Sequence, residues 1–281
     1  MSQGEKGMEP LRLPEVPLGP HSVSRLIAGG NPPHGGSHQT RLMSTHMREY
    51  FTLDQTVTFL QRCQAQGMTT WQSSYSQKLR YALTIFREQG GQMQFICLCS
   101  PKDMEDERTL SEVLSLNPIG IAFHGEVTDR IWRAGEIDTA LDTLARIRDT
   151  GVLVGLSTHN PEVIAYTEEK GWDLDFYMAC VYRKSRDRKE LMEIMQEAPI
   201  GEIYLPSDVP RMCETVRKAT KTCLAFKILA AGRTCDTPEQ VENAFKYVLG
   251  HIKPTDAVIV GMYPRYTDQI RENADLVRKY G

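Results

Sequence analysis

Eight short apolar runs recur along this chain of 281 residues, separated by turn signals and amphipathic stretches. The runs lack clean alternation of apolar and polar residues, which is typical of parallel strands buried on both faces. Strand–helix alternation with right-handed crossovers produces a parallel sheet. The runs cover residues 24–30, 69–73, 94–99, 120–124, 152–157, 174–180, 223–229 and 256–261.

The number of repeats indicates a closed sheet. Eight strand–helix units fit a (β/α)8 barrel, the TIM barrel of the α/β class, better than an open sheet. An open dinucleotide-binding sheet has a G-x-G-x-x-G turn directly after its first strand. Residues 29–36 contain glycines, but at a different spacing and without an immediate helix. We predict an N-terminal arm or hairpin over residues 1–17 and one (β/α)8 barrel domain over residues 18–281.

Helix signals stand between the runs. Residues 53–66 have helical periodicity after Thr52 and end at Gly67, and Asn160 precedes Pro161 as an N-cap. The two longest connections, residues 31–52 and 182–222, follow the first and sixth strands. Long loops at the carboxyl ends of barrel strands cover or build the functional site, so we expect both near it.

Composition limits the partners and the compartment. The net charge of −3, without a basic stripe interleaved with aromatics, argues against nucleic-acid binding. The seven cysteines are odd in number and lie mostly in apolar runs, which is typical of reduced thiols in the cytoplasm. No segment approaches the roughly 18 apolar residues of a membrane helix. We expect a soluble cytoplasmic protein with a small-molecule substrate, and the sequence leaves its oligomeric state open.

Three side chains point to chemistry at the carboxyl-terminal mouth of the barrel. His124 ends the fourth strand, where a general acid, an electrophile or a metal ligand would lie, and His159 follows the fifth with its imidazole free to face the mouth. The ordinary alternative for each is a hydrogen-bonded structural histidine. Lys227 lies among apolar residues, where a charge is costly unless it is paired or functional. It suits a general base, an anion partner or a Schiff-base amine, or it reaches the rim beside an acidic residue.

The loops after the last two strands have the features of a phosphate site. Gly232 with Arg233 follows the seventh strand, and Gly261 with Arg265 follows the eighth. In many barrels these two loops bind a phosphate group, with the glycines admitting close approach of the backbone. A glycine at such a turn also has a purely conformational explanation.

A metal site is a competing interpretation of the same mouth. His124, His159 and Cys180 end three successive strands, and together they could hold a zinc-type divalent ion. A buried free thiol is the commoner role for a cysteine such as Cys180.

Several segments resemble the aldo/keto reductase superfamily over about residues 18–281. Residues 17–30 resemble its hairpin and first strand, and residues 120–124 resemble the strand with the catalytic histidine. Residues 151–157 resemble its G-x-x-x-x-x-G-x-S-N stretch, and residues 260–273 resemble its nucleotide-phosphate segment.

The resemblance implies NADPH-dependent carbonyl reduction by an Asp–Tyr–Lys–His tetrad. His124 matches the histidine, but Gln72 stands at the aspartate position and the third strand ends at Ser100 without a lysine. Tyr75 lies two residues before the position of the tyrosine. Thr158 replaces the nicotinamide-binding asparagine, Lys227 replaces the stacking aromatic, and the implied cofactor-binding residues are Ser157, Gly232, Arg233, Gly261, Arg265 and Asn273.

Three functions follow as hypotheses. The first is an aldo/keto-reductase-like enzyme acting on a small carbonyl or hydroxyl compound with NADP(H), in which His124, Lys227, His159 and Tyr75 form a non-standard catalytic set. The second is a lyase, isomerase or hydrolase in the same barrel, with Lys227 as the base and a divalent metal. The third is a non-catalytic barrel that binds a ligand or partner.

Overall fold

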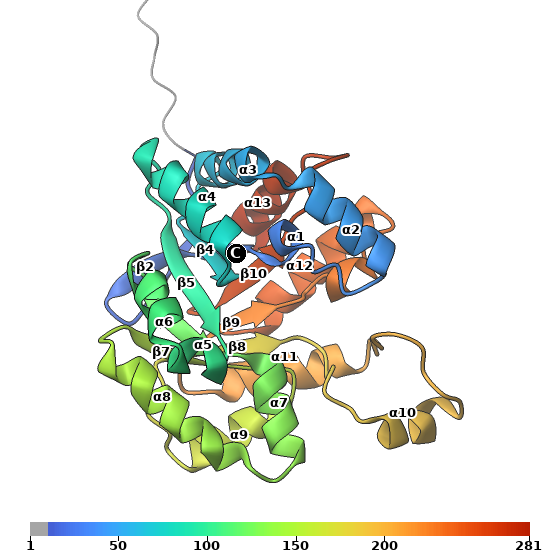
Figure 1. The fold of residues 1–281 in the computed structure, drawn as a ribbon. Helices are drawn as coiled ribbons and strands as arrows, with labels where there is room; N and C mark the ends of the chain where they lie inside the picture. The colour runs from blue at the N-terminus through green and yellow to red at the C-terminus, as the bar shows by residue number, and fades with distance from the viewer. Residues whose placement is uncertain (1–10) are drawn as a thin grey trace, which may run out of the picture.

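The eight apolar runs form parallel strands that close into a barrel in the computed structural model, which describes residues 11–281 (Figure 1). The predicted (β/α)8 fold is therefore confirmed. The order around the barrel is β10-β3-β4-β5-β6-β7-β8-β9, so the last strand pairs with the first. The strands are β3 (Leu26–Gly29), β4 (Thr70–Ser74), β5 (Gln94–Cys99), β6 (Gly120–Phe123), β7 (Leu153–Thr158), β8 (Phe176–Cys180), β9 (Thr222–Phe226) and β10 (Ala257–Gly261).

Helices surround the strands, and their first residues show why they begin there. Thr52, Asn160 and Thr237 each accept a backbone N–H with their side chains, at the starts of α3, α9 and α12. The helices are α1 (Asn31–His34), α2 (Arg41–Tyr50), α3 (Leu53–Ala65), α4 (Gln77–Glu88), α5 (Pro101–Glu105), α6 (Glu107–Leu114), α7 (Gly125–Arg133), η1 (Ile137–Thr139), α8 (Ala140–Asp149), α9 (Pro161–Glu169), α10 (Arg188–Met195), α11 (Asp208–Lys218), η2 (Ala230–Gly232), α12 (Pro238–His251) and α13 (Gln269–Tyr280).

A hairpin of β1 (Glu15–Leu18) and β2 (His21–Ser24) closes the amino-terminal end of the barrel. Leu18 and Val23 are fully buried in the cluster that fills the barrel interior. Gln94 and Thr222, at the starts of β5 and β9, donate side-chain hydrogen bonds to carbonyls of the hairpin. The opposite, carboxyl-terminal mouth is therefore the end of the barrel that the hairpin leaves open. Of the arm predicted over residues 1–17, residues 1–10 lie outside the described part of the chain.

Two expectations about elements need correction. The first run, residues 24–30, is not one strand, because Ser24 ends β2 and Leu26 begins β3. Between them the Arg25 guanidinium donates to the carbonyls of Asp256, Leu249 and Lys253, and the chain bends around it. The connection after β3 is not a plain loop, since it contains α1 and α2. Within residues 11–281, none of the helices has both the length and the apolar character needed to cross a bilayer.

Candidate functional site at the barrel mouth

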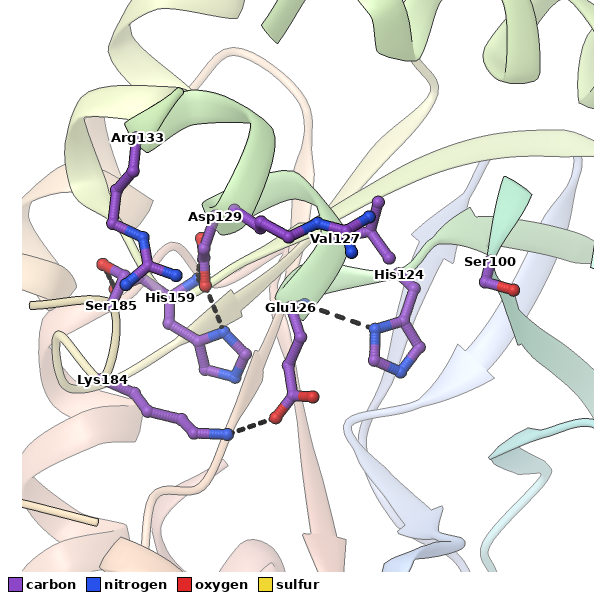
Figure 2. Close-up of a pocket in the computed structure, with 10 residues that line it drawn as sticks. Ser100, His124, Glu126, Val127, Asp129, Arg133, His159, Lys184 and Ser185 are labelled. Atoms are coloured by element: carbon purple, nitrogen blue, oxygen red, sulfur yellow. Dashed lines mark hydrogen bonds and ion pairs between the residues drawn. The ribbon is translucent and has the colours of Figure 1, made fainter. Parts of the chain in front are cut away.

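A pocket of about 480 Å³ opens at the carboxyl ends of β6 and β7 (Figure 2). Its walls come from the ends of these strands and of β5, from α7 and from the loop after β8. Two histidines, two carboxylates and three basic side chains line it, so it is suited to a polar ligand. The lining residues are Ser100, His124, Glu126, Val127, Asp129, Arg130, Arg133, His159, Lys184 and Ser185.

His159 is held by a buried carboxylate. Its Nδ1 lies 2.7 Å from Oδ2 of Asp129, and both side chains are less than 10% exposed. Asp129 also accepts the backbone N–H of His159 and the hydroxyl of Thr158. Because an ionised carboxylate only accepts hydrogen bonds, Nδ1 carries the proton and Nε2 keeps its lone pair. Burial lowers the pKa of His159, and Asp129 offsets part of that shift.

His124 lies across the pocket from His159 (Figure 2). It is the N-cap of α7, and its Nδ1 accepts the backbone N–H of Glu126 at 3.3 Å. This contact assigns the ring proton to Nε2, so His124 presents a hydrogen-bond donor. Burial lowers the pKa of His124, while the carboxylates of Glu126 and Asp103 oppose that shift. The pocket thus has one imidazole that accepts a proton and one that donates a hydrogen bond.

Lys184 links the pocket to the centre of the mouth. Its ammonium contacts the carboxylate of Glu126 and lies 3.3 Å from Oε2 of Glu202. Burial opposes the charge of Lys184, but the hydrogen bond and the charges of these two carboxylates raise its pKa overall. Lys184 therefore stays cationic beside both imidazoles.

Lys227 lies in the centre of the mouth with 6% of its side chain exposed, and it is paired with Glu202 at 3.0 Å. Burial lowers the pKa of Lys227, while Cys180 and Glu202 oppose that shift. Burial also disfavours the charge on Glu202. The hydrogen bond from His38 and the charge of Lys227 outweigh it and hold the pKa of that carboxyl well below its usual range.

The residues expected to bind phosphate are engaged with the protein. The Arg233 guanidinium donates to the carbonyls of His38, Glu202 and Ala230. A Cβ on Gly232 would lie 2.7 Å from Nε2 of Gln39, and one on Gly261 would lie 2.9 Å from Cδ of Pro32. The loop after β3 therefore covers both glycines.

Arg265, Asn273, Ser157 and Tyr75 lie apart from the lining of the pocket. Arg265 lies over the rings of Tyr50 and Tyr266, at 5.7 Å from each centroid. Asn273 is buried in α13, and Ser157 is buried in β7 beside Gly125.

The hydroxyl of Tyr75 donates a hydrogen bond to Glu112 of α6. Burial and this hydrogen bond raise the pKa of Tyr75 to about 12. A phenol with that pKa is a weak proton donor near neutrality.

The three-ligand metal set is not assembled. Cys180 is fully buried, and burial raises the pKa of its thiol to about 12. Among the described residues, no three His, Cys, Asp or Glu side chains are placed to share a metal ion.

Sequence reasoning missed three acidic residues of the mouth: Asp129, Glu126 and Glu202. Asp129 follows His124 by five residues, so an acidic residue in the helix directly after a mouth histidine was a usable signal. Glu202 follows β8 by more than 20 residues, and nothing in its local pattern points to the mouth.

No protein-family model and no curated protein matches this chain. Solved structures do match it. The holo form of aldo-keto reductase AKR11C1 from Bacillus halodurans aligns with a TM-score of 0.56 and 13% identity, over 95% of this chain and 91% of that one. A mutant of Gox0644 in complex with NADPH aligns with a TM-score of 0.55 and 12% identity, over 94% and 88%.

The fold is shared more widely than one superfamily. A truncated 3-deoxy-D-arabino-heptulosonate 7-phosphate synthase from Thermotoga maritima aligns with a TM-score of 0.52 and 13% identity, over 95% of this chain and 90% of that one. These likenesses show the fold alone. Function has to be argued from the site.

Proposed function

We propose that this chain is a divergent aldo/keto-reductase-like barrel enzyme that catalyses proton transfer on a small carbonyl or hydroxyl compound, as an isomerase or a lyase. The observation that carries the proposal is the buried His159–Asp129 pair, which lines a pocket at the mouth of the barrel. Active sites of this fold lie at that mouth. The matches to aldo-keto reductase structures support the proposed ancestry.

His159 is the base in this proposal. Its lowered pKa keeps the imidazole neutral near pH 7, and Asp129 fixes the tautomer that leaves Nε2 free. Nε2 takes a proton from a carbon next to a carbonyl, and the electron pair of the C–H bond moves onto the carbonyl oxygen. Asp129 stabilises the imidazolium that forms, and His159 then returns the proton to the product or to the leaving group.

His124 and Lys184 stabilise the negative charge on the substrate oxygen. The Nε2–H of His124 donates to it, and the Lys184 ammonium supplies a positive charge at the same pocket. Preorganised donors aimed at a developing oxyanion are worth about 10²- to 10³-fold in rate each.

Incorporation of solvent deuterium tests the proposal. We expect the protein in D₂O to exchange the C–H proton of at least one short-chain 2-oxo or 2-hydroxy carboxylate, followed by proton NMR. His159→Gln should slow this exchange by about 10²- to 10⁴-fold. The control His251→Gln, at an exposed site on α12, should leave it unchanged. The proposal fails if His159→Gln retains the wild-type rate, or if the panel shows no exchange.

A second candidate, NADP(H)-dependent reduction of a carbonyl, is favoured by the Gox0644 structure solved with NADPH. His124 would hold the carbonyl oxygen, and Ser157, Asn273 and the loops after β9 and β10 would hold the nucleotide. In this arrangement the two loops do not fit the nucleotide, since Arg233 is bonded to loop carbonyls and Pro32 covers Gly261. We therefore expect no saturable NADPH binding in the micromolar range. Saturable binding in a fluorescence titration would favour reduction instead.

A further inference from the structure

One carboxylate at the centre of the mouth is surrounded by four donors from three separate segments. We name these residues the Glu202 cluster: Glu202, Lys227, Lys184, His38 and Tyr182. The Glu202 oxygens lie 3.0 Å from Nζ of Lys227, 3.0 Å from Nδ1 of His38 and 3.3 Å from Nζ of Lys184. The hydroxyl of Tyr182 donates to the same carboxylate.

The donors and the acceptor differ in how firmly the fold holds them. Tyr182 is fully buried just after β8, and Lys227 directly follows β9. Glu202 lies in the excursion of residues 186–207, in which no residue is buried and from which α10 projects away from the barrel (Figure 1). Asp208 joins the two ends of this excursion, because it accepts from Arg186 and from the backbone N–H of Arg183. Segments with few buried contacts open at low free-energy cost.

The charges at the mouth leave a surplus of cations without Glu202. Lys227, Lys184 and Arg233 all lie within 4.0 Å of its carboxylate, and within residues 11–281 Glu126 is the other acid that contacts one of these cations. If Glu202 leaves, three cations face one carboxylate. Partly buried cations in excess are costly unless an anion takes the vacated place.

We propose that the Glu202 side chain occupies a binding site for a carboxylate of the substrate, and that the substrate displaces it when it binds. The donors of the cluster already hold the Glu202 carboxylate by both oxygens, so the substrate group that they recognise is also a carboxylate. This inference rests on the proposed function and deepens it by naming the recognition group. The shared residue Lys184 places this anion site next to the His159–Asp129 pair.

The backbone at Lys227 supports a preformed site. Lys227 has φ of +61°, and Ala230 and Ala231 that follow also have positive φ. Non-glycine residues in this region are strained and persist where the surroundings over-determine them, which happens most often at binding and catalytic sites.

Calorimetric titration with malonate tests the inference. It measures binding without turnover, so a failure of the inference is distinguishable from a failure of the proposed proton-transfer chemistry. An internal competitor reduces the apparent affinity in proportion to its occupancy of the site. We expect Glu202→Gln, which keeps the shape and removes the charge, to bind malonate at least about tenfold more tightly than the wild type. The control Glu193→Gln removes an exposed charge from α10 in the same excursion and should bind like the wild type.

Two further measurements complete the test. Adding Lys227→Met to Glu202→Gln should abolish the increase in malonate affinity. The same titrations with inorganic phosphate show whether the site prefers a carboxylate. In the unmodified protein, malonate should speed tryptic cleavage at Arg188 and Lys189, because it releases the excursion. Equal or weaker malonate binding by Glu202→Gln, or slower cleavage with malonate, would show that Glu202 is only a structural clamp.

Discussion

At the scale of single residues, the mouth depends on close packing that only glycine permits. Gly30 precedes α1, and a Cβ added there would lie 2.2 Å from Oγ and 2.9 Å from Cα of Ser73. Gly30→Ala should therefore destabilise the protein by about 1–3 kcal/mol in urea unfolding. The control is Gly250 in α12, where an added Cβ meets nothing within 4 Å. Gly250→Ala should stabilise the protein by about 0.5–1 kcal/mol, and equal effects of the two changes would refute this description of the packing.

The sequence predicted the mouth residues that directly follow strands better than the mouth residue that a long connection carries there. His124 and His159 both line the pocket, because each directly follows a buried strand and strand ends meet at one mouth. Lys227 was expected to be either paired or functional, and its partner, Glu202, was not identifiable from the sequence. Its position depends on the path of a long excursion, and local periodicity contains no information about that path.

At the scale of elements, the N-terminal hairpin is part of the barrel core. Leu18 is fully buried against side chains inside the barrel, whereas Leu11 is 47% exposed. Leu18→Ala should cost about 2–5 kcal/mol of unfolding free energy, because it leaves a cavity that the barrel cannot close. Leu11→Ala should change stability by less than about 0.5 kcal/mol. A Leu18→Ala protein as stable as the Leu11→Ala protein in urea titrations would contradict this role of the hairpin.

The helix starts with clear N-caps were predicted, and the helix in the long connection after β3 was missed. The caps Thr52 and Asn160 correctly marked the starts of two helices. The long connection after β3 contains α2, in which Met43, Met47 and Tyr50 recur at helical spacing and pack half-buried on the core, and this periodicity was not used. The break at Arg25 depends on carbonyls more than 200 residues away, which no local pattern reveals.

At the scale of the whole molecule, stability should fall in mild acid. Burial lowers the pKa of His34, His124 and His159, whereas the unfolded chain binds protons at the ordinary histidine pKa of about 6.5. Unfolding therefore takes up protons below that pH, so the stabilisation is complete above about pH 6.5 and is lost as the pH falls. The unfolding free energy should decrease by at most about 1.4 kcal/mol per pH unit for each histidine.

Urea titrations between about pH 7.5 and 5.5 measure this dependence. His34→Gln should make the dependence shallower, because it removes one of the three groups. Stability that stays constant or rises as the pH falls through this range would contradict the buried, neutral state of the histidines.

The barrel as a whole followed from the count of eight strand–helix units, and the hairpin at its amino-terminal end leaves one mouth for chemistry. The central claim concerns the base at that mouth, and ¹⁵N NMR titration of histidine-labelled protein tests it most directly. We predict that His159 is neutral at pH 7 with its proton on Nδ1, and that Asp129→Asn lowers its pKa further, since Asp129 favours the imidazolium. A cationic His159 at pH 7, or a proton on Nε2, would contradict the account.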